Sequence, residues 1–318
     1  MARYNAATAV NSATYAEIAT LIQLRHAAAQ LRHFPKINAK AQLAGGQRSR
    51  FRGRGMDFDE VRLYQPGDDI RAIDWRVTAR TQVPHTKLYR EEKERPIVIV
   101  TDLRPTMLFG SCALKSVLAC EAAALLCWAG LAANDQVGGI VAGAEQQWEV
   151  RPRRSAHSAL NYLHRLSEAS AALSQATEPS GQPALTLEAL LAETKKIVKP
   201  GTSLFILSDF IDIDEDCQKH LAELCRHADL TLLAVSDPLE HTLPERGRFT
   251  VADQQQSINF NAADAQLRQR FREARSRQQA LLDNVVERHR AALLQLSTAE
   301  PALTPLGRAY GRAARSRR

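Results

Sequence analysis

Three acidic residues stand where they could bind a cation. Asp102, Asp209 and Asp237 each follow a run of apolar residues typical of a buried β-strand. Parallel strands end at the same edge of a sheet, and open α/β folds bind ligands outside that edge, so these carboxylates could meet there. Acids in this position more commonly cap the following helix. Two of them converging on one point would instead make a metal or cation site.

The run that ends in Asp102 is the most informative stretch. Residues 96–102 are rich in β-branched side chains and do not alternate between apolar and polar. This pattern predicts a central strand that is buried on both faces, as in a parallel sheet. A loop at residues 103–106 follows, and a long apolar helix is predicted from near Ser111.

The remaining elements alternate in the same way. We expect an α/β fold with a doubly wound, mostly parallel sheet of von Willebrand factor A (Rossmann-like) type and a small β-rich N-terminal element. The predicted strands are 96–102, 137–142, 202–207 and 229–235, with hairpins at 137–150 and 249–260; the predicted helices are 14–33, 111–133, 156–168, 187–198, 215–227 and 262–296.

Charge divides the chain of 318 residues unevenly. Of the net charge of +7, residues 1–56 contribute +8 and residues 301–318 contribute +5, which leaves the body at −6. Basic ends indicate an acidic partner or simply a solvated terminus. We predict four segments: a helical, basic segment at 1–55, a β-rich element at 56–95, the α/β domain at 96–260, and a helix with a basic tail at 261–318.

The cysteine and hydropathy patterns indicate in which cellular compartment the protein resides. The five cysteines are odd in number, lack CxxC spacing and lie mostly in apolar helical contexts, as buried free thiols do in a reducing compartment. No signal peptide is visible, and the most apolar window, 117–133, is short for a membrane span and contains Glu121. We therefore expect a cytoplasmic protein without a transmembrane segment.

Residues 56–80 combine alternating acids and arginines with apolar residues. Ile70, Ile73, Trp75 and Val77 are predicted to be buried anchors, and residues 66–69 form a turn signal. No histidine lies among these charges to act as a base, so an ion-pair and turn network is expected rather than a catalytic dyad.

This region resembles a known signature. The run from Arg54 to Arg80, with Pro-Gly-Asp-Asp-Ile-Arg at 66–71 and Ile-Asp-Trp at 73–75, is similar to the domain of unknown function 58 family. The resemblance implies a von Willebrand factor A-like domain and a role beside a MoxR-type AAA+ ATPase in assembling or activating other protein complexes. The matching signature residues are Pro66, Gly67, Asp68, Asp69, Arg71, Asp74, Trp75 and Arg80.

The same resemblance implies a metal-ion-dependent adhesion site. Its first loop reads Asp-x-Ser-x-Ser, and later loops add a Thr and an Asp; here Asp102, Thr106, Thr186 and Asp209 match. Arg104 replaces the middle hydroxyl, and a guanidinium repels Mg²⁺ rather than binding it. Arg104 could pair with Asp102 or Asp209 and replace the cation, or it could point to solvent.

Two functions remain open from the sequence. The first is a non-enzymatic adaptor that binds an ATPase and a client protein at Asp102, Arg104, Thr106, Thr186 and Asp209, and the cofactor implied by the resemblance is Mg²⁺ at the degenerate adhesion site. The second is binding of nucleic acid or an anionic surface by the basic run at 48–54, the last helix and the Arg-rich tail, although only one aromatic residue is interleaved in that run. A metal-dependent hydrolase has little support, because the histidines are scattered.

Overall fold

The chain folds into two compact units. The computed structural model describes residues 13–31, 56–65, 70–91, 96–144, 146–175, 185–242, 247–252, 257–289 and 291–311. The larger unit contains the described residues up to 31 and those from 96 onward, and the smaller unit contains those between 56 and 91.

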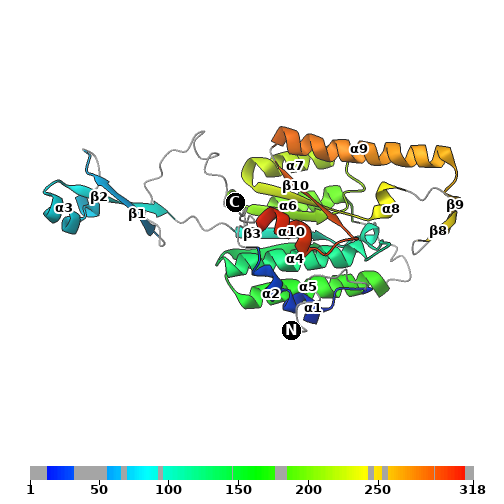
Figure 1. Ribbon diagram of the computed structural model, residues 1–318, viewed down its shortest axis with the longest axis horizontal. Coiled ribbons are helices and arrows are strands. Elements are labelled where there is room, and N and C mark those ends of the chain that lie inside the picture. Colours follow the sequence, from blue (N-terminus) through cyan, green and yellow to red (C-terminus); the bar gives the residue numbers. More distant parts are fainter. Residues whose placement is uncertain are drawn as a thin grey trace, which may run out of the picture. The chain divides into compact units, whose positions relative to one another are not determined.

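A six-stranded sheet forms the centre of the larger unit (Figure 1). Its order is β10-β7-β6-β3-β4-β5, and only β5 is antiparallel to its neighbour. The fold-class prediction of an α/β protein with a mostly parallel sheet is therefore confirmed. The strands are β3 (Pro96–Asp102), β4 (Gln136–Ala142), β5 (Gln147–Arg153), β6 (Ser203–Ser208), β7 (Asp229–Ser236) and β10 (Ala292–Ser297).

Helices cover both faces of this sheet, which explains why β3 is apolar throughout. Ile97 and Ile99 pack into the cluster on one face, and Val98 and Val100 pack into the cluster on the other. The first face carries α1 (Ile18–Gln23), α2 (Arg25–Ala28), α4 (Lys115–Ala132), α5 (Ala156–Gln175) and α10 (Leu303–Tyr310); the second carries α6 (Leu187–Ile197), α7 (Glu215–His227) and α9 (Ala265–His289).

Helix α4 differs from the other described helices in its hydropathy. Of the described helices, it is the one long and apolar enough to cross a membrane, with a mean hydropathy of 1.4 over 18 residues. The share of this stretch buried inside the protein is 83%. Its packing is that of a core helix, in contact with the sheet, with α5 beside it on the same face and with α2.

The C-terminal part differs from its prediction. A helix was expected over 262–296, but α9 ends at His289 and residues 292–297 form β10, which pairs in parallel with β7 at the sheet edge. The strand is short and weakly patterned, so only its partner strand identifies it. Helix α5 likewise continues to Gln175, although residues from 169 were expected to form a loop.

A 3₁₀ helix, a short α-helix and a two-stranded hairpin also belong to the larger unit. A 3₁₀ helix, η4, covers Pro105–Met107, and α8 covers Pro238–His241. The predicted terminal hairpin is confirmed as β8 (Arg248–Ala252) and β9 (Ser257–Asn261), where Phe249 and Phe260 stack with ring centroids 5.8 Å apart.

The smaller unit is an antiparallel pair of strands with short helical elements. Strand β1 (Met56–Leu63) pairs with β2 (His85–Glu91), and the 3₁₀ helix η3 (Ile70–Ala72) and α3 (Trp75–Thr81) lie between them in sequence. Among the described residues, the strand that pairs with β2 is β1.

The predictions for the signature region of this unit are confirmed at some residues and wrong at others. Asp74 caps α3 by accepting hydrogen bonds from the backbone of Arg76 (3.0 Å) and Val77 (3.2 Å). The prediction that Trp75 and Ile70 are buried anchors is wrong, because they are 66% and 64% exposed. A two-stranded sheet with one short helix has no second layer to cover them. The turn at Pro66, Gly67, Asp68 and Asp69 lies outside the described residues, and Arg71 and Arg80 lie on exposed positions.

Candidate functional site

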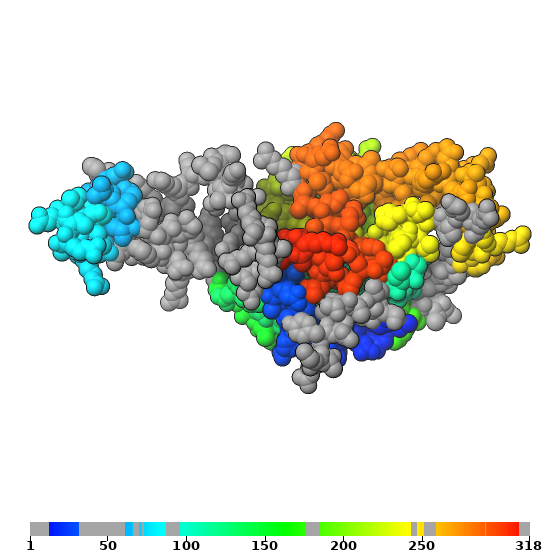
Figure 2. Space-filling model, in the orientation of Figure 1, coloured from blue at the N-terminus to red at the C-terminus, as the bar shows by residue number. Residues whose placement is uncertain are grey.

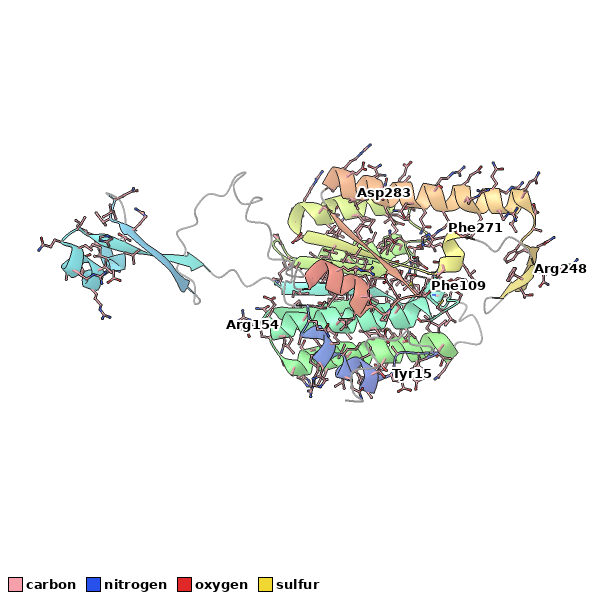
Figure 3. All side chains as sticks on the ribbon, in the orientation of Figure 1. Tyr15, Phe109, Arg154, Arg248, Phe271 and Asp283 are labelled. Carbon is pink, nitrogen blue, oxygen red and sulfur yellow. The ribbon has the colours of Figure 1, made fainter. Side chains whose placement is uncertain are left out.

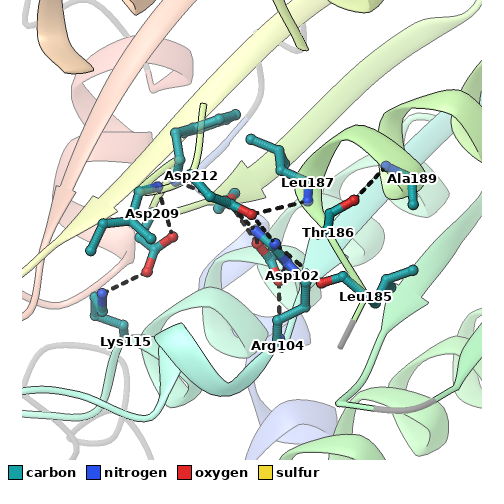
Figure 4. Close-up of polar contacts among 12 residues, drawn as sticks. Asp102, Arg104, Lys115, Leu185, Thr186, Leu187, Ala189, Asp209 and Asp212 are labelled. Atoms are coloured by element: carbon teal, nitrogen blue, oxygen red, sulfur yellow. Dashed lines mark hydrogen bonds and ion pairs between the residues drawn. The ribbon is translucent and has the colours of Figure 1, made fainter. Parts of the chain in front are cut away.

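The candidate site lies at the carboxyl ends of β3 and β6, which are neighbours in the sheet. Asp102 is the last residue of β3, Asp209 directly follows β6, and Thr186 precedes α6. Figure 4 shows that these residues, far apart in sequence, meet at this edge together with Arg104 and Lys115. The structure thus brings the predicted residues together, but it surrounds their carboxylates with basic side chains.

Arg104 binds both oxygens of Asp102. Its Nε donates to Oδ1 at 3.0 Å and its Nη2 donates to Oδ2 at 2.8 Å. The backbone N–H of Arg104 also donates to Oδ1 at 3.0 Å, and the hydroxyl of Ser208 donates to Oδ2 at 2.7 Å. Asp102 is fully buried and Arg104 is 3% exposed, so the expectation that Arg104 points to solvent is wrong and its pairing with Asp102 is confirmed.

A second carboxylate, Asp212, holds the other side of the guanidinium (Figure 4). Nη1 donates to Oδ2 at 2.6 Å and Nη2 donates to Oδ1 at 2.9 Å. A longer bond of 3.4 Å runs from Nη1 to the carbonyl of Leu185. All five guanidinium N–H groups therefore have an acceptor within the chain, and Arg104 has none left for a ligand.

These contacts shift the pKa of both partners. Burial alone would lower the pKa of Arg104, but the hydrogen bonds and charges of Asp212 and Asp102 outweigh it and raise the pKa above its ordinary value. Burial would raise the pKa of Asp212, but Arg104 and the N–H of Leu187 (3.1 Å) lower it. The charged forms are therefore favoured on both sides of the pair.

Asp209 is paired with a different cation. The Nζ of Lys115, at the start of α4, lies 2.7 Å from Oδ2 of Asp209 and 2.6 Å from Oε1 of Glu240. Lys115 is 1% exposed. The prediction that Asp209 is a member of the site holds in position, but its carboxylate is neutralised by a buried lysine rather than by Arg104.

The two threonine hydroxyls of the expected metal motif differ in their hydrogen bonding. The Oγ1 of Thr186 accepts from the backbone N–H of Ala189 at 3.1 Å, so Thr186 caps α6 as an ordinary N-cap. The Oγ1 of Thr106 is buried and has no hydrogen-bond partner among the described residues. Neither hydroxyl contacts a carboxylate of the site in the described hydrogen bonds.

The third acid after a strand, Asp237, has the helix-capping role. It accepts from the backbone of Leu239 at the start of α8, and Glu240 bonds back to its N–H at 3.0 Å. It also accepts from Ser111 and from Thr298, which follows β10. Burial would raise the pKa of Asp237, but these hydrogen bonds lower it.

The residues do not fit a divalent cation as they are arranged. Mg²⁺ requires several free oxygen ligands in near-octahedral geometry. Here both oxygens of Asp102 and one oxygen of Asp209 are occupied by Arg104 and Lys115, and these charges would repel a metal. Within the described ranges, no group of three or more His, Cys, Asp or Glu side chains is placed to hold a metal ion. The arrangement is suited to recognition by a preformed surface.

Sequence reasoning missed Asp212, Lys115 and Glu240. The sequence offered a weak indication for Asp212, because this residue lies in the acidic loop that follows β6. It offered another for Lys115, because this is the single basic residue in an otherwise apolar helix. Glu240 resembled an ordinary surface acid before its pairing was known.

The cysteines agree with their prediction of buried free thiols except at Cys112, which is exposed. All five are free thiols, and Cys120, Cys127 and Cys217 are buried. Burial raises the pKa of Cys127 to about 12, which keeps this thiol protonated and unreactive at neutral pH.

Comparison with known proteins places the chain among uncharacterized relatives. It is 28% identical over 251 residues to "Uncharacterized protein Mb1516" of Mycobacterium bovis and to "Uncharacterized protein Rv1480" of Mycobacterium tuberculosis, covering 77% of this chain and 76% of each relative. A crystal structure of an uncharacterized membrane spanning protein from Vibrio fischeri matches 60% of this chain and 96% of its own at 13% identity, but with a TM-score of 0.20 it supports no inference.

The family itself is clear from a longer match. Residues 60–281, which are more than half of the chain, match the family described as "Protein of unknown function DUF58". This span includes the smaller unit from β1 onward, the whole candidate site and most of α9. The resemblance seen in the signature at residues 54–80 is therefore confirmed, and the chain belongs to the DUF58 family.

Proposed function

We propose that this protein is a non-enzymatic cytoplasmic adaptor that works with a MoxR-type AAA+ ATPase in the assembly or activation of a protein complex. Its larger unit is a von Willebrand factor A-like domain whose partner-binding edge contains Asp102, Arg104, Thr106, Thr186 and Asp209. One observation carries this proposal. At the sheet edge where the adhesion motif would hold a metal, a buried guanidinium joins Asp102 to Asp212.

The built-in cation changes how a partner is recognised. In a metal-dependent adhesion site, the ion keeps a position open for a carboxylate of the partner. Arg104 has all its donors occupied within the chain, so it cannot serve a partner in that way. Its function is to fix the loops after β3 and β6 in one arrangement, without dependence on metal.

Two accessible groups of this edge lie next to each other on the loop after β6. Ile211 is 48% exposed, and the side chain of its neighbour Asp212 is 38% exposed. An apolar side chain beside a carboxylate suits a partner that presents an apolar residue next to a Lys or Arg. The preferred partner therefore has the opposite charge from the ligand of a metal-dependent site.

The smaller unit supports a second contact with partners. It leaves Leu63, Ile70, Trp75 and Val83 between 47% and 66% exposed. These are four of the six exposed large apolar side chains in the part of the chain that the structure describes. Exposed apolar residues that include a tryptophan are typical of protein interaction surfaces.

The test is affinity capture of the tagged full-length protein from its native host, with nucleotide added and nuclease treatment. The edge variant combines Ile211→Ala with Asp212→Asn, and the control is Asp216→Asn, an exposed acid on α7. We expect a MoxR-type ATPase, captured in a nucleotide-dependent way, to be lost from the edge variant and kept by the control. Normal capture of both ATPase and client by a folded edge variant would reject this edge.

Nucleic-acid binding is the alternative, and one feature of α9 favours it. The first half of this helix contains five arginines and one acid, and Arg270, Arg272 and Arg277 are exposed. Figure 3 shows many of the α9 side chains projecting away from the sheet. The alternative predicts DNA or RNA binding that weakens steeply as salt increases. No binding at low salt, or binding insensitive to salt, would reject it.

A further inference from the structure

A small cavity lies beside α9 and borders the proposed partner edge at Asp209. Its volume is about 210 Å³, and it lies at the carboxyl end of β7, with walls from α9, α8 and β10. In Figure 2, α9 (orange) and the segments around α8 and β8 (yellow) form part of the exposed surface of the larger unit. The polar walls include Ser236, His241, Arg275, Gln278 and Gln279, and Leu282 contributes to the apolar part.

A single guanidinium supplies the positive charge in the lining of this cavity. Arg275 is the one permanent cation among its lining residues, and Asp209 is the one acid. The carboxylate of Asp209 is bound to Lys115, and it is the backbone carbonyl of Asp209 that accepts a hydrogen bond from Gln278 of the cavity lining. Hydroxyl and amide groups of Ser236, Gln278 and Gln279 add hydrogen-bonding capacity around the guanidinium.

Two hydrogen bonds hold Arg275 in place. Its Nη1 donates to Oε1 of Gln278 at 2.7 Å, and Nε2 of Gln278 donates to the carbonyl of Asp209 at 2.9 Å. On the opposite wall, the Nε2 of His241 lies 3.0 Å from the hydroxyl of Ser236. One bond to Gln278 leaves the other guanidinium N–H groups of Arg275 without a partner among the described residues, so the fork can bind an anion.

We propose that this cavity binds a small phosphate-bearing molecule, with Arg275 as the main ligand of the phosphate. A planar guanidinium fork matches phosphate oxygens in geometry and charge. The volume is below the roughly 300–1,000 Å³ of pockets for drug-sized ligands, so the molecule is of the size of a single sugar phosphate. The polar amides suit the hydroxyls of such a ligand, and Leu282 packs against its apolar side.

The experiment is isothermal titration calorimetry on the full chain, with ribose 5-phosphate, inorganic phosphate and ribose as probes at constant ionic strength. The variant is Arg275→Gln. The control is Arg277→Gln, which makes the same charge change on the same helix but does not line the cavity. We expect wild type and Arg277→Gln to bind each phosphate compound with equal affinity, and neither protein to bind ribose. We expect Arg275→Gln to bind the phosphate compounds at least about tenfold more weakly than wild type.

Three results would overturn the proposal. They are no binding of either phosphate compound to wild type, equal weakening in Arg275→Gln and Arg277→Gln, and unchanged binding in Arg275→Gln. Unfolding curves establish that the variants are folded. His241→Ala, at an exposed position that lines the cavity, is the second variant should Arg275→Gln fail to fold, and it is expected to weaken binding severalfold.

Discussion

Arg104 lies on the loop after β3, two residues beyond Asp102 at the end of that strand, and two side-chain hydrogen bonds of 3.0 and 2.8 Å join them in a buried pair. The adhesion motif would place a hydroxyl at position 104 and a metal beside Asp102. This chain instead carries the positive charge on its own side chain and adds Asp212 as a second acceptor. The carboxylate of Asp102 is therefore paired without a metal ion.

Removal of this guanidinium should be costly. Arg104→Met leaves Asp102 buried without a countercharge, and we expect a loss of about 3–5 kcal/mol in the free energy of unfolding. The matched control is Arg165→Met, which breaks an exposed ion pair with Glu168 on α5 and should cost at most about 1 kcal/mol. Urea denaturation measures both, and equal small losses would contradict the buried pair.

Metal removal should leave the native protein unchanged. We expect the same thermal midpoint in Mg²⁺ and in EDTA, because Arg104 and Lys115 occupy the carboxylates. Arg104→Ser removes one positive charge and supplies the missing hydroxyl, so this variant should gain stabilisation by Mg²⁺ that grows with concentration. Specific stabilisation of wild type by Mg²⁺ over Na⁺ at equal ionic strength would contradict this account.

Lys115 should contribute as much as Arg104 to the free energy of unfolding. Lys115→Met leaves the carboxylates of Asp209 and Glu240 close together without their shared cation, and we expect a loss of about 3–5 kcal/mol. Lys219→Met makes the same substitution at an exposed lysine of α7, where the free energy of unfolding should hardly change. Chemical denaturation of the two variants in parallel separates these outcomes.

Trp75 should matter for binding more than for folding. A fully buried tryptophan would cost about 3–5 kcal/mol on replacement by Ala. At 66% exposure, Trp75→Ala should cost less than about 1 kcal/mol and reduce capture of the partner ATPase. Leu160→Ala, at a 39% exposed position on α5, is the control for a general loss of apolar surface. Unfolding of the Trp75 variant would show that the smaller unit needs this side chain for stability.

Acid should weaken the contact of Asp212 with Arg104. The pKa of Asp212 is lowered in the folded state from its ordinary value of 3.8, so its stabilising effect is fully present above that value. The effect is lost as the pH falls through the lowered pKa. The stability difference between wild type and Asp212→Asn should thus be constant from pH 7 to about 5 and narrow below about pH 4. Urea midpoints across this range measure it, and a difference that widens in acid would contradict the assignment.

Much of the fold was predictable because its signals are local. The buried run at 96–102, the helix predicted over 187–198 and the hairpin near 249–260 each depend on residues close in sequence, and the structure confirms them. Strand β10 was missed because its pattern is weak and its strand character depends on pairing with β7, some sixty residues earlier in the chain.

For the site, the sequence determined which acids stand at the carboxyl edge of the sheet, since strand ends can be located from hydropathy. Only the tertiary structure decided their partners. Lys115 is separated from Asp209 by 94 residues and from Glu240 by 125, so no local pattern predicts those pairs. The exposure of Trp75 was decided in the same way, because burial depends on whether a second layer exists to cover a side chain and not on the side chain alone.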